Sequence, residues 1–138
     1  MGWQKTFSLP ELSKGCHVIT DDVVKQISDG IKDVKVGMLF LFIQHSSAAL
    51  SISEKFDQDV PADMEMALDA IVPETLKWRR THSGKDESVA PTKATLVGST
   101  VSVPIKDGSL NLGSWQDMYL LEFIHTPQTR YVVATILS

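Results

Sequence analysis

A histidine and two hydroxyl side chains stand directly after an unbroken apolar stretch of the chain. Residues 38–43 are all Met, Leu, Phe or Ile, and the stretch ends abruptly in Gln44-His45-Ser46-Ser47. Imidazole can ligate a metal or exchange a proton near neutral pH, and hydroxyl groups can donate hydrogen bonds to a bound anion. We therefore predict a polar site at the end of a rigid strand, containing His45, Ser46 and Ser47. The alternative is that His45 is a core histidine whose hydrogen bonds are satisfied inside the protein.

A second group of candidate residues lies in the polar segment 74–95. It contains Trp78, Arg79, Arg80 and His82 in close succession. Guanidinium groups bind phosphate or carboxylate in a bidentate fork, so the two arginines are candidate phosphate ligands. A polar loop of this length inside a compact domain is usually functional or disordered. The alternative is a solvated basic turn that offsets nearby acidic residues.

The spacing of potential metal ligands is weak evidence for a metal site. A catalytic zinc ion needs about three protein ligands and an open position. The four histidines, His17, His45, His82 and His125, are widely spaced and form no HExxH pattern. The single cysteine, Cys16, excludes an internal disulfide, and we interpret it as a small core residue. The chain also lacks a P-loop, a dinucleotide-binding fingerprint and a GxSxG motif.

The elements that must position these residues are mainly strands. We interpret residues 38–43 as a central strand buried on both faces, and residues 48–54 as a second strand that ends at Glu54. A helix is predicted after Asp21-Asp22, and another from near Pro61 to just before Pro73. Apolar residues at helical spacing support both helices: Val23, Val24, Ile27 and Ile31 in the first, and Met64, Ala67, Leu68 and Ile71 in the second. Further strands are predicted at residues 3–9, 15–20 and 131–137, and at residues 94–105 with an interruption at Gly98. After a hairpin turn at residues 106–109, a return strand is predicted to begin at residues 110–115 and to continue at residues 118–123.

These elements do not repeat as βαβ units. They predict a single α+β domain over residues 1–138, a largely antiparallel or mixed β-sandwich with two main helices. The composition, 43% hydrophobic and 22% charged, is typical of a soluble globular domain. No segment is long and apolar enough to span a membrane, and no hydrophobic leader precedes the first strand, so we expect a cytoplasmic protein with possible access to the nucleus.

Short segments along the chain follow one another in a recognisable order. They are Gln44–Glu54, Asp59-Val60, Leu96–Ser99, Asp107-Gly108, Leu112–Gln116, Leu121–Phe123 and Val133–Leu137. In this order they resemble the HTSAALTINE, LLG, DG, LGTWQ and final-strand segments of the YjbQ-like family, known as secondary thiamine-phosphate synthases. The resemblance extends over nearly the whole chain. It implies an α+β fold, a homotrimer, and the coupling of a pyrimidine pyrophosphate to a thiazole phosphate with release of pyrophosphate.

The resemblance also implies a site in which three histidines meet near a subunit boundary. His45 takes the place of the first and His82 that of the second, whereas Pro91 stands where the family has the third. Proline can neither ligate a metal nor exchange a proton, so we expect a divalent metal, zinc or magnesium, to be bound weakly or not at all. Glu54, Asp86 or a residue of a neighbouring subunit would have to replace the missing ligand.

Two further positions differ from the family pattern, since Ser53 replaces an asparagine and Asp117 replaces a glycine. The resemblance and the residue types together assign catalytic roles to His45, Glu54 and His82. They assign substrate or phosphate binding to Ser46, Ser47, Arg79, Arg80, Lys93, Trp115 and Gln116. In this assignment Arg79, Arg80 and Lys93 supply positive charge, and Trp115 or Trp78 supplies a wall for an aromatic ring.

The resemblance, taken with these residues, implies two functions of different classes. One is a low-level transferase of the thiamine-phosphate synthase type with a degenerate histidine site. The other is a non-catalytic trimer that binds a phosphate or metabolite and has lost its metal-dependent chemistry. In both cases the expected partner is a small phosphorylated metabolite, with no nucleic acid and no membrane. Binding of nucleic acid through residues 77–80 has little support at a net charge of −4.

Overall fold

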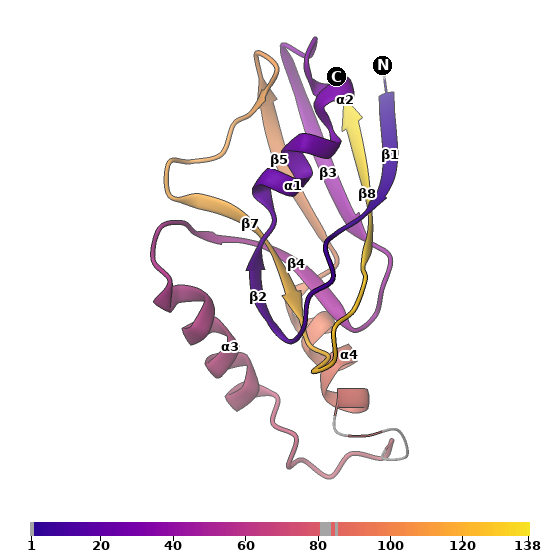
Figure 1. Cartoon of the computed structure of the whole chain (residues 1–138), viewed down its shortest axis with the longest axis vertical. Helices are drawn as coiled ribbons and strands as arrows, with labels where there is room; N and C mark the ends of the chain where they lie inside the picture. The colour runs from indigo at the N-terminus through magenta and orange to yellow at the C-terminus, as the bar shows by residue number, and fades with distance from the viewer. Residues whose placement is uncertain (1, 81–83, 85) are drawn as a thin grey trace.

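The computed structural model describes residues 2–80, 84 and 86–138, apart from the side chains of residues 86 and 87, and it contains two antiparallel sheets (Figure 1). The large sheet has the strand order β1 (Gly2–Ser8), β8 (Tyr131–Leu137), β3 (Val36–Ile43), β5 (Thr100–Lys106) and β6 (Ser109–Leu110). The small sheet has the order β2 (Gly15–Val18), β7 (Gln116–Glu122) and β4 (Ala48–Glu54). The helices are α1 (Thr20–Gln26), α2 (Ser28–Ile31), α3 (Asp59–Ile71) and α4 (Asp86–Val97). The α+β class is confirmed, and so is the central position of residues 38–43 within a sheet.

The two sheets pack against each other through alternate residues of their strands, because successive side chains of a strand point to opposite faces. The contacts come from Leu39, Leu41 and Ile43 of β3, from Val132, Ala134 and Ile136 of β8, and from Leu50, Met118 and Leu120 of the small sheet. None of these side chains is more than 2% exposed. The first two helices complete this core with Val23, Ile27 and Ile31.

The central strand β3 is buried on one face, and the prediction that both faces are buried was wrong. Its inner residues are covered, whereas Phe42 is 47% exposed and Met38 and Phe40 are partly exposed. The helices pack elsewhere: α1 and α2 lie on the inner face, and α3 and α4 lie on the small sheet. An apolar run in a sequence does not reveal whether the second face of a strand is covered by the same chain. The outer face of the large sheet is therefore apolar and uncovered along β3.

The segment after β2 forms two short helices, where the sequence predicted one. Ile27 separates them, and its N–H donates to the carbonyl of Val23 at 3.0 Å. Val24 is 46% exposed, although the sequence predicted it on the buried face. At Gly30 the helix meets the ring of Trp3 closely, since a Cβ there would lie 2.2 Å from that ring.

The longer helices cover the other face of the small sheet and enclose a second apolar cluster. The predicted limits of α3 are nearly correct: the helix begins at Asp59, whose N–H donates to the Asp57 carboxylate at 2.9 Å, and it ends before Pro73. Leu68 packs against the cluster, but Ile71 is 64% exposed, against expectation.

Helix α4 is the largest departure from the sequence prediction, which made residues 74–95 a loop and residues 94–105 a strand. The helix carries almost no amphipathic pattern and holds Pro91 in its interior, so nothing local indicates it. Packing supplies the stability instead, since Ala90 is fully buried against the small sheet. The helix ends before Gly98, whose φ of 115° suits glycine.

The hairpin predicted at residues 106–109 is confirmed. Lys106 pairs with Ser109, and Asp107 and Gly108 both have positive φ, 49° and 76°, as two-residue hairpin turns require. The return strand is shorter than predicted, because β6 ends at Leu110. The final strand, residues 131–137, is confirmed.

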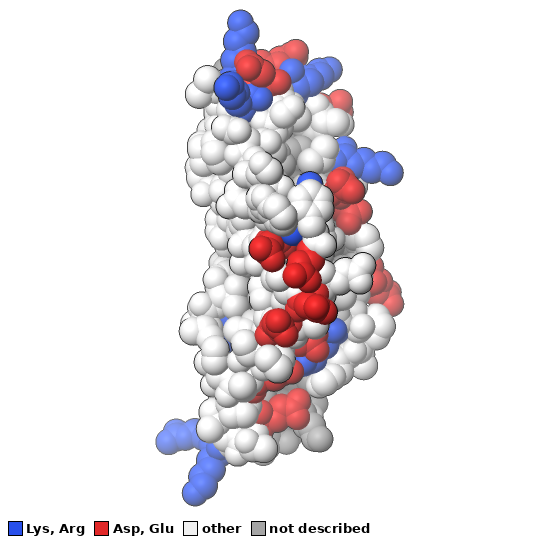
Figure 2. Space-filling view, turned by 90° about the vertical axis from the view of Figure 1, so that its left-hand side faces the viewer, with Lys and Arg blue, Asp and Glu red and all other residues white. Residues whose placement is uncertain are grey.

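The surface on the α3 side of the molecule is mainly acidic. Figure 2 shows Asp and Glu side chains in a column down the middle of this face, with Lys and Arg projecting at its two ends. Within the described part of the chain, no helix is both long and apolar enough to cross a membrane.

Candidate functional site

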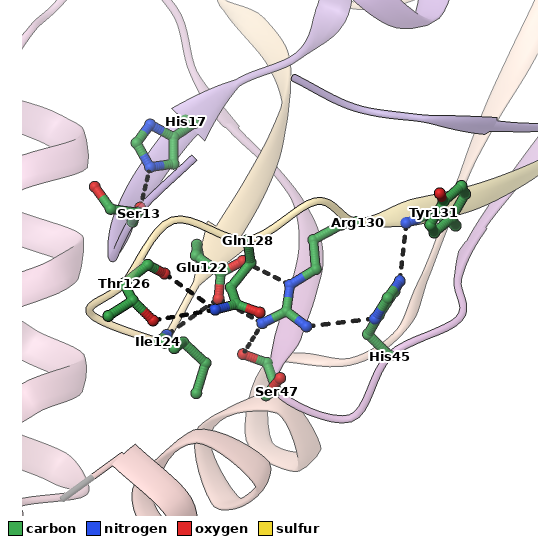
Figure 3. A network of polar contacts seen from close by, with 10 residues as sticks. All are labelled: Ser13, His17, His45, Ser47, Glu122, Ile124, Thr126, Gln128, Arg130 and Tyr131. Carbon is green, nitrogen blue, oxygen red and sulfur yellow. Dashed lines mark hydrogen bonds and ion pairs between the residues drawn. The ribbon is translucent and has the colours of Figure 1, made fainter. Parts of the chain in front are cut away.

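His45 lies where the chain crosses from the large sheet to the small one, between β3 and β4. The chain crosses back through residues 123–130, between β7 and β8. Because β3 pairs with β8 and β4 pairs with β7, the two crossings lie side by side: Ile43 is opposite Val132, and Ala48 is opposite Glu122. The topology thereby brings Arg130, which is 85 positions away in sequence, next to His45 (Figure 3).

A buried ion pair underlies this crossing. Arg130 donates from Nε and Nη2 to the two carboxylate oxygens of Glu122, both at 2.6 Å. Arg130 is 4% exposed and Glu122 is 1% exposed. Glu122 also accepts the N–H of Ile124 at 3.1 Å, and Arg130 donates to the carbonyl of Ser47 at 3.4 Å. The pair thus ties both crossings together, with Ser47 contributing its backbone oxygen.

Both nitrogens of the His45 ring face hydrogen-bond donors. Nε2 accepts the backbone N–H of Tyr131 at 2.9 Å, and Nη1 of Arg130 lies 3.3 Å from Nδ1. The ring also stacks on Tyr131, with centroids 6.2 Å apart and planes 14° apart. A neutral imidazole has one lone pair and one N–H, so the bond from Tyr131 places the proton on Nδ1, against the guanidinium of Arg130. An additional proton on His45 would go to Nε2. There it would face the N–H of Tyr131 and break that hydrogen bond.

The pKa of His45 is accordingly lowered from its ordinary value. Burial is the main cause, because it penalises the charged imidazolium, and the positive charge of Arg130 acts in the same direction. The carboxylate of Glu122 opposes the shift without cancelling it. His45 is therefore held in its neutral form near neutral pH.

A cavity of about 260 Å³ opens beside His45 and Ser46. Its other wall comes from α4 and the turn that follows it, through Pro91, Thr95 and Ser99. The Thr95 hydroxyl donates to the carbonyl of Pro91 at 2.9 Å. Pro91, aligned with a family histidine on sequence grounds, thus lies in the same cavity as His45.

The arginines predicted to bind phosphate line a neighbouring hollow of about 430 Å³, together with Lys77, Trp78 and Pro91. Pro91 borders both spaces, so they are adjacent. Ser88 of α4 donates to the carbonyl of Arg80 at 2.6 Å and holds the segment against the helix. His82, the second expected histidine, lies outside the described residues.

Three of the predicted site residues lie at the far end of β4. Glu54 ends this strand opposite Gln116, about seven residues or roughly 20 Å from the start of the strand near His45. Trp115 is 64% exposed and makes an edge-to-face contact with Phe56, with ring centroids 5.5 Å apart. The structure therefore does not bring Glu54, Trp115 or Gln116 to His45 within one chain.

Lys93 lies in different surroundings from the other predicted phosphate ligands. It is 2% exposed, its ammonium binds the carboxylate of Asp69, and it lies 5.7 Å from the centre of the Phe123 ring. Lys14 binds the other oxygen of Asp69 at 2.9 Å. Burial by itself would raise the pKa of Asp69, but the hydrogen bonds from Lys93 and Lys14 outweigh it and lower this pKa. Lys93 thus neutralises an acid on α3 and lines cavities that do not include His45.

The described residues do not fit a three-histidine metal site. Nε2 of His45 already accepts the N–H of Tyr131 and Nδ1 faces the guanidinium of Arg130, while the Pro91 side chain has no lone pair to offer where a third ligand would lie. Among the residues that the structure describes, no three His, Cys, Asp or Glu side chains converge as metal ligands would. The sulfur of Cys16 is also unsuited, because burial raises the pKa of its thiol to about 11.

Sequence analysis gave no role to Glu122, Arg130 or Tyr131, which hold His45, although Glu122 lay in the segment Leu121–Phe123. Their types carried little signal, since a lone arginine before a strand is normally a surface residue. Only the pairing of β4 with β7 and of β3 with β8 makes them neighbours of His45. Ser99 was noticed in the sequence as part of a motif but received no role.

Comparison with known proteins agrees with this fold. The sequence pattern of the family described as UPF0047 protein YjbQ-like matches residues 5–138. The chain belongs to this family. It is 33% identical to the UPF0047 protein YjbQ of Salmonella typhimurium over 136 residues, which cover 99% of the chain and 98% of the relative. It is 34% identical to a UPF0047 protein of Synechocystis over 104 residues, 75% of the chain and 71% of that relative.

Solved structures of YjbQ-like proteins have the same fold. A crystal structure of a yjbq/upf0047 family protein of Clostridium acetobutylicum superposes with a TM-score of 0.78 at 30% identity, covering 99% of each chain. A YbjQ-like protein of Sulfolobus solfataricus gives a TM-score of 0.84 at 22% identity, covering 100% of this chain and 99% of its own.

Two positions of this YjbQ-like chain that sequence analysis set apart from the family pattern lie opposite each other. Ser53 of β4 pairs with Asp117 of β7. Asp117 is 7% exposed and accepts the hydroxyl of Thr20 at 2.6 Å. Both lie towards the end of β4 that is remote from His45, whereas Pro91 lines the cavity beside it.

Proposed function

We propose that the protein binds a small phosphorylated metabolite across the His45 cavity and the adjacent basic hollow. One observation carries this proposal: Pro91 borders both spaces, so a cavity lined by an imidazole and hydroxyls adjoins a hollow lined by Lys77, Arg79 and Arg80. Arginine recognises phosphate with paired N–H groups, and the hydroxyls of Ser46 and Ser99 suit the polar groups of the remaining ligand. Trp78, which borders the same hollow, offers a face for an aromatic ring.

His45 enters this proposal as a neutral ring that lines the cavity and not as a metal ligand. Its lowered pKa favours the neutral form, and its ring is oriented by Tyr131 and Arg130. Divalent metal, if needed for turnover, would require ligands beyond those described here. The geometry therefore favours the second function predicted from the sequence, which is a binding protein without metal-dependent chemistry.

The second candidate function is a transferase of the thiamine-phosphate synthase type, which the family resemblance implies. In that reaction the ring nitrogen of the thiazole phosphate forms a bond to the pyrimidine methylene, and the bond from that carbon to pyrophosphate breaks. This reaction requires positive charge at the leaving pyrophosphate. Lys77, Arg79 and Arg80 would supply that charge. Glu54, Trp115 and Gln116 would take part only if another subunit brought them to His45.

Binding and turnover can be tested separately. The affinity of the protein for pyrophosphate and for the thiazole phosphate is measured by calorimetry in wild type, Arg79→Gln and the control Lys106→Gln, which removes the same charge on another surface. We expect Arg79→Gln alone to weaken binding, by about tenfold for one charge-assisted hydrogen bond. Unchanged affinity in Arg79→Gln, or no binding to wild type, would show that the basic hollow is not a phosphate site.

Turnover is then measured with both thiamine precursors and magnesium or zinc, comparing wild type with His45→Ala. Binding without turnover indicates the non-catalytic function. Turnover that falls in His45→Ala supports the transferase, whereas a rate that survives this substitution would place the reaction outside this site.

We also propose that the chain forms a homotrimer through the outer face of the large sheet. Phe42, Tyr131 and Leu137 on this face are 47–50% exposed, and Met38 pairs with Leu137 to extend the apolar surface. Such a surface is typical of a subunit contact, and it adjoins His45 through Tyr131. The stoichiometry of three is what the family resemblance implies.

Sedimentation equilibrium at micromolar concentration tests this assembly. We expect a trimer for wild type and a smaller species for Phe42→Lys, with an unchanged far-UV spectrum because Phe42 points away from the core. A monomeric wild-type protein would refute the trimer, and a Phe42→Lys trimer would place the interface on another face.

A further inference from the structure

A third space, a cleft, lies away from His45, beyond the other end of β4. It has a volume of about 410 Å³ and lies between α1 and α2 on one side and residues 108–116 on the other. Its floor is apolar: Ile27 is fully buried, Ile31 is 7% exposed, and Leu110 and Leu112 are partly buried against the core. This volume lies within the range of small-molecule sites, about 300–1,000 Å³.

The walls of the cleft are held in place by backbone hydrogen bonds. The N–H of Gly108 donates to the carbonyl of Val34 at 2.7 Å, and a Cβ at Gly108 would lie only 2.9 Å from the carbonyl oxygen of Lys32. On the other side, Gln116 accepts the N–H of Gly113 at 2.8 Å through its side-chain oxygen. The N–H of Lys55 donates to the carbonyl of Trp115 at 2.7 Å. The cleft is therefore preformed, which reduces the entropic cost of binding a ligand.

The polar groups at the cleft are suited to an anion. Lys55 is the only charged residue among the described residues that line it. Its ammonium lies 5.1 Å from the centre of the Phe56 ring, and none of the carboxylates in the described part of the chain is within ion-pair distance of it. The hydroxyl of Thr20 is already used, because it donates to Asp117 and accepts the N–H of Met118. The Gln116 oxygen is also used, which leaves the amide NH₂ of that side chain as a second donor.

We propose that this cleft binds a small aromatic monocarboxylate, with the ring on the apolar floor and the carboxylate on Lys55 and the Gln116 amide. A closed cavity of about 150 Å³ holds one benzene molecule, so an open cleft of about 410 Å³ has room for a fused two-ring compound. The positive charge is complementary to a carboxylate in a chain whose overall charge is −4. Within one chain this site is separate from the proposed phosphate site, since the two share no lining residue.

The test uses 2-naphthoate and its uncharged counterpart 2-naphthamide as probes. Binding is followed through the backbone amide resonances of Gly108 and Gly113 in labelled protein, with Lys25→Gln as the control for loss of one positive charge on the exposed side of α1. We expect naphthoate to shift both glycine resonances and to bind about tenfold more tightly than naphthamide. Lys55→Gln should abolish this preference while Lys25→Gln keeps it.

Val24→Trp provides a second variant, because Val24 borders the cleft and is 46% exposed, so a larger side chain there fills the space without entering the core. It should abolish binding of both probes. Absence of shifts at millimolar naphthoate, or equal affinities for the two probes in wild type, would overturn the proposal. A change in sedimenting mass in Val24→Trp would also overturn it, since the cleft would then be occupied by a second copy of the chain.

Discussion

Arg130 and Glu122 face each other through two hydrogen bonds of 2.6 Å in a site where both are nearly fully buried. The two residues are eight positions apart: Glu122 ends β7, and Arg130 ends the crossing that follows it. Their geometry is bidentate, which is the strongest arrangement available to these groups. Through Nη1 of Arg130 the pair also reaches the ring of His45. The buried pair thus connects the fold to the candidate site.

Removing one partner of this pair should destabilise the folded protein far more than removing both. Among the residues that the structure describes, Arg130→Met leaves the buried Glu122 carboxylate with the N–H of Ile124 as its one remaining partner. We expect this variant to lower the free energy of unfolding by about 3–5 kcal/mol. Arg130→Met combined with Glu122→Leu should recover most of the loss, because it removes the unpaired charge. Urea denaturation measures both, and a double variant as unstable as the single one would contradict this account.

The lowered pKa of His45 should make stability depend on pH. In the folded protein His45 remains neutral at pH values where the unfolded chain, with an ordinary pKa of 6.5, takes up a proton. The unfolded state therefore binds more protons, and stability should fall as the pH drops from about 6.5 towards the folded pKa. His45→Gln should flatten this part of the profile, since an amide oxygen can still accept the Tyr131 N–H. Thermal unfolding between about pH 5 and pH 7.5 measures the effect, and an NMR titration that placed the pKa of His45 at or above 6.5 would contradict it.

Removing Asp69 from its ion pair with Lys93 should lower the free energy of unfolding more than removing Lys93. Asp69→Asn leaves a buried ammonium without a carboxylate, and we expect it to cost about 2–4 kcal/mol. Lys93→Met leaves Asp69 43% exposed and still bound to Lys14 at 2.9 Å, so we expect a loss of about 1 kcal/mol or less. Chemical denaturation of the two variants tests the order. Equal losses in the free energy of unfolding would contradict this expectation. They would show that the pair acts as a unit and that the burial of Lys93 does not determine the cost.

Restoring a histidine at position 91 should raise metal affinity. We expect the unmodified protein to hold little zinc after equilibration and desalting, and Pro91→His to hold more, because imidazole replaces a residue that cannot ligate. Pro91→Ala is the matched control, since it restores the backbone N–H within α4 without adding a ligand. Zinc per chain is measured for all three. One zinc per unmodified chain would mean that another ligand has replaced the family histidine, and equal low contents would mean that position 91 is not the metal position.

Local sequence determined several elements of this protein. The Asp107-Gly108 turn, the final strand and the limits of α3 follow from residues that interact within a few positions of one another, and all were predicted nearly as they occur. The placement of His45 at the polar end of a central strand also follows from sequence alone. The apolar run requires a strand within the core, and the abrupt change to polar residues requires that strand to end there.

Only the tertiary structure decided what surrounds His45 and which candidates remain near it. Arg130 and Glu122 are buried because two crossings between sheets happen to lie side by side, and strand pairing across some 80 residues has no local signature. Packing against the small sheet stabilises α4 although its sequence has almost no helical pattern, and this places Pro91 opposite His45. The same packing turns Lys93 inward to Asp69, while the length of β4 separates Gln116 from His45. Long-range contacts decide these positions, because burial of a charge depends on a partner that the neighbouring sequence does not specify.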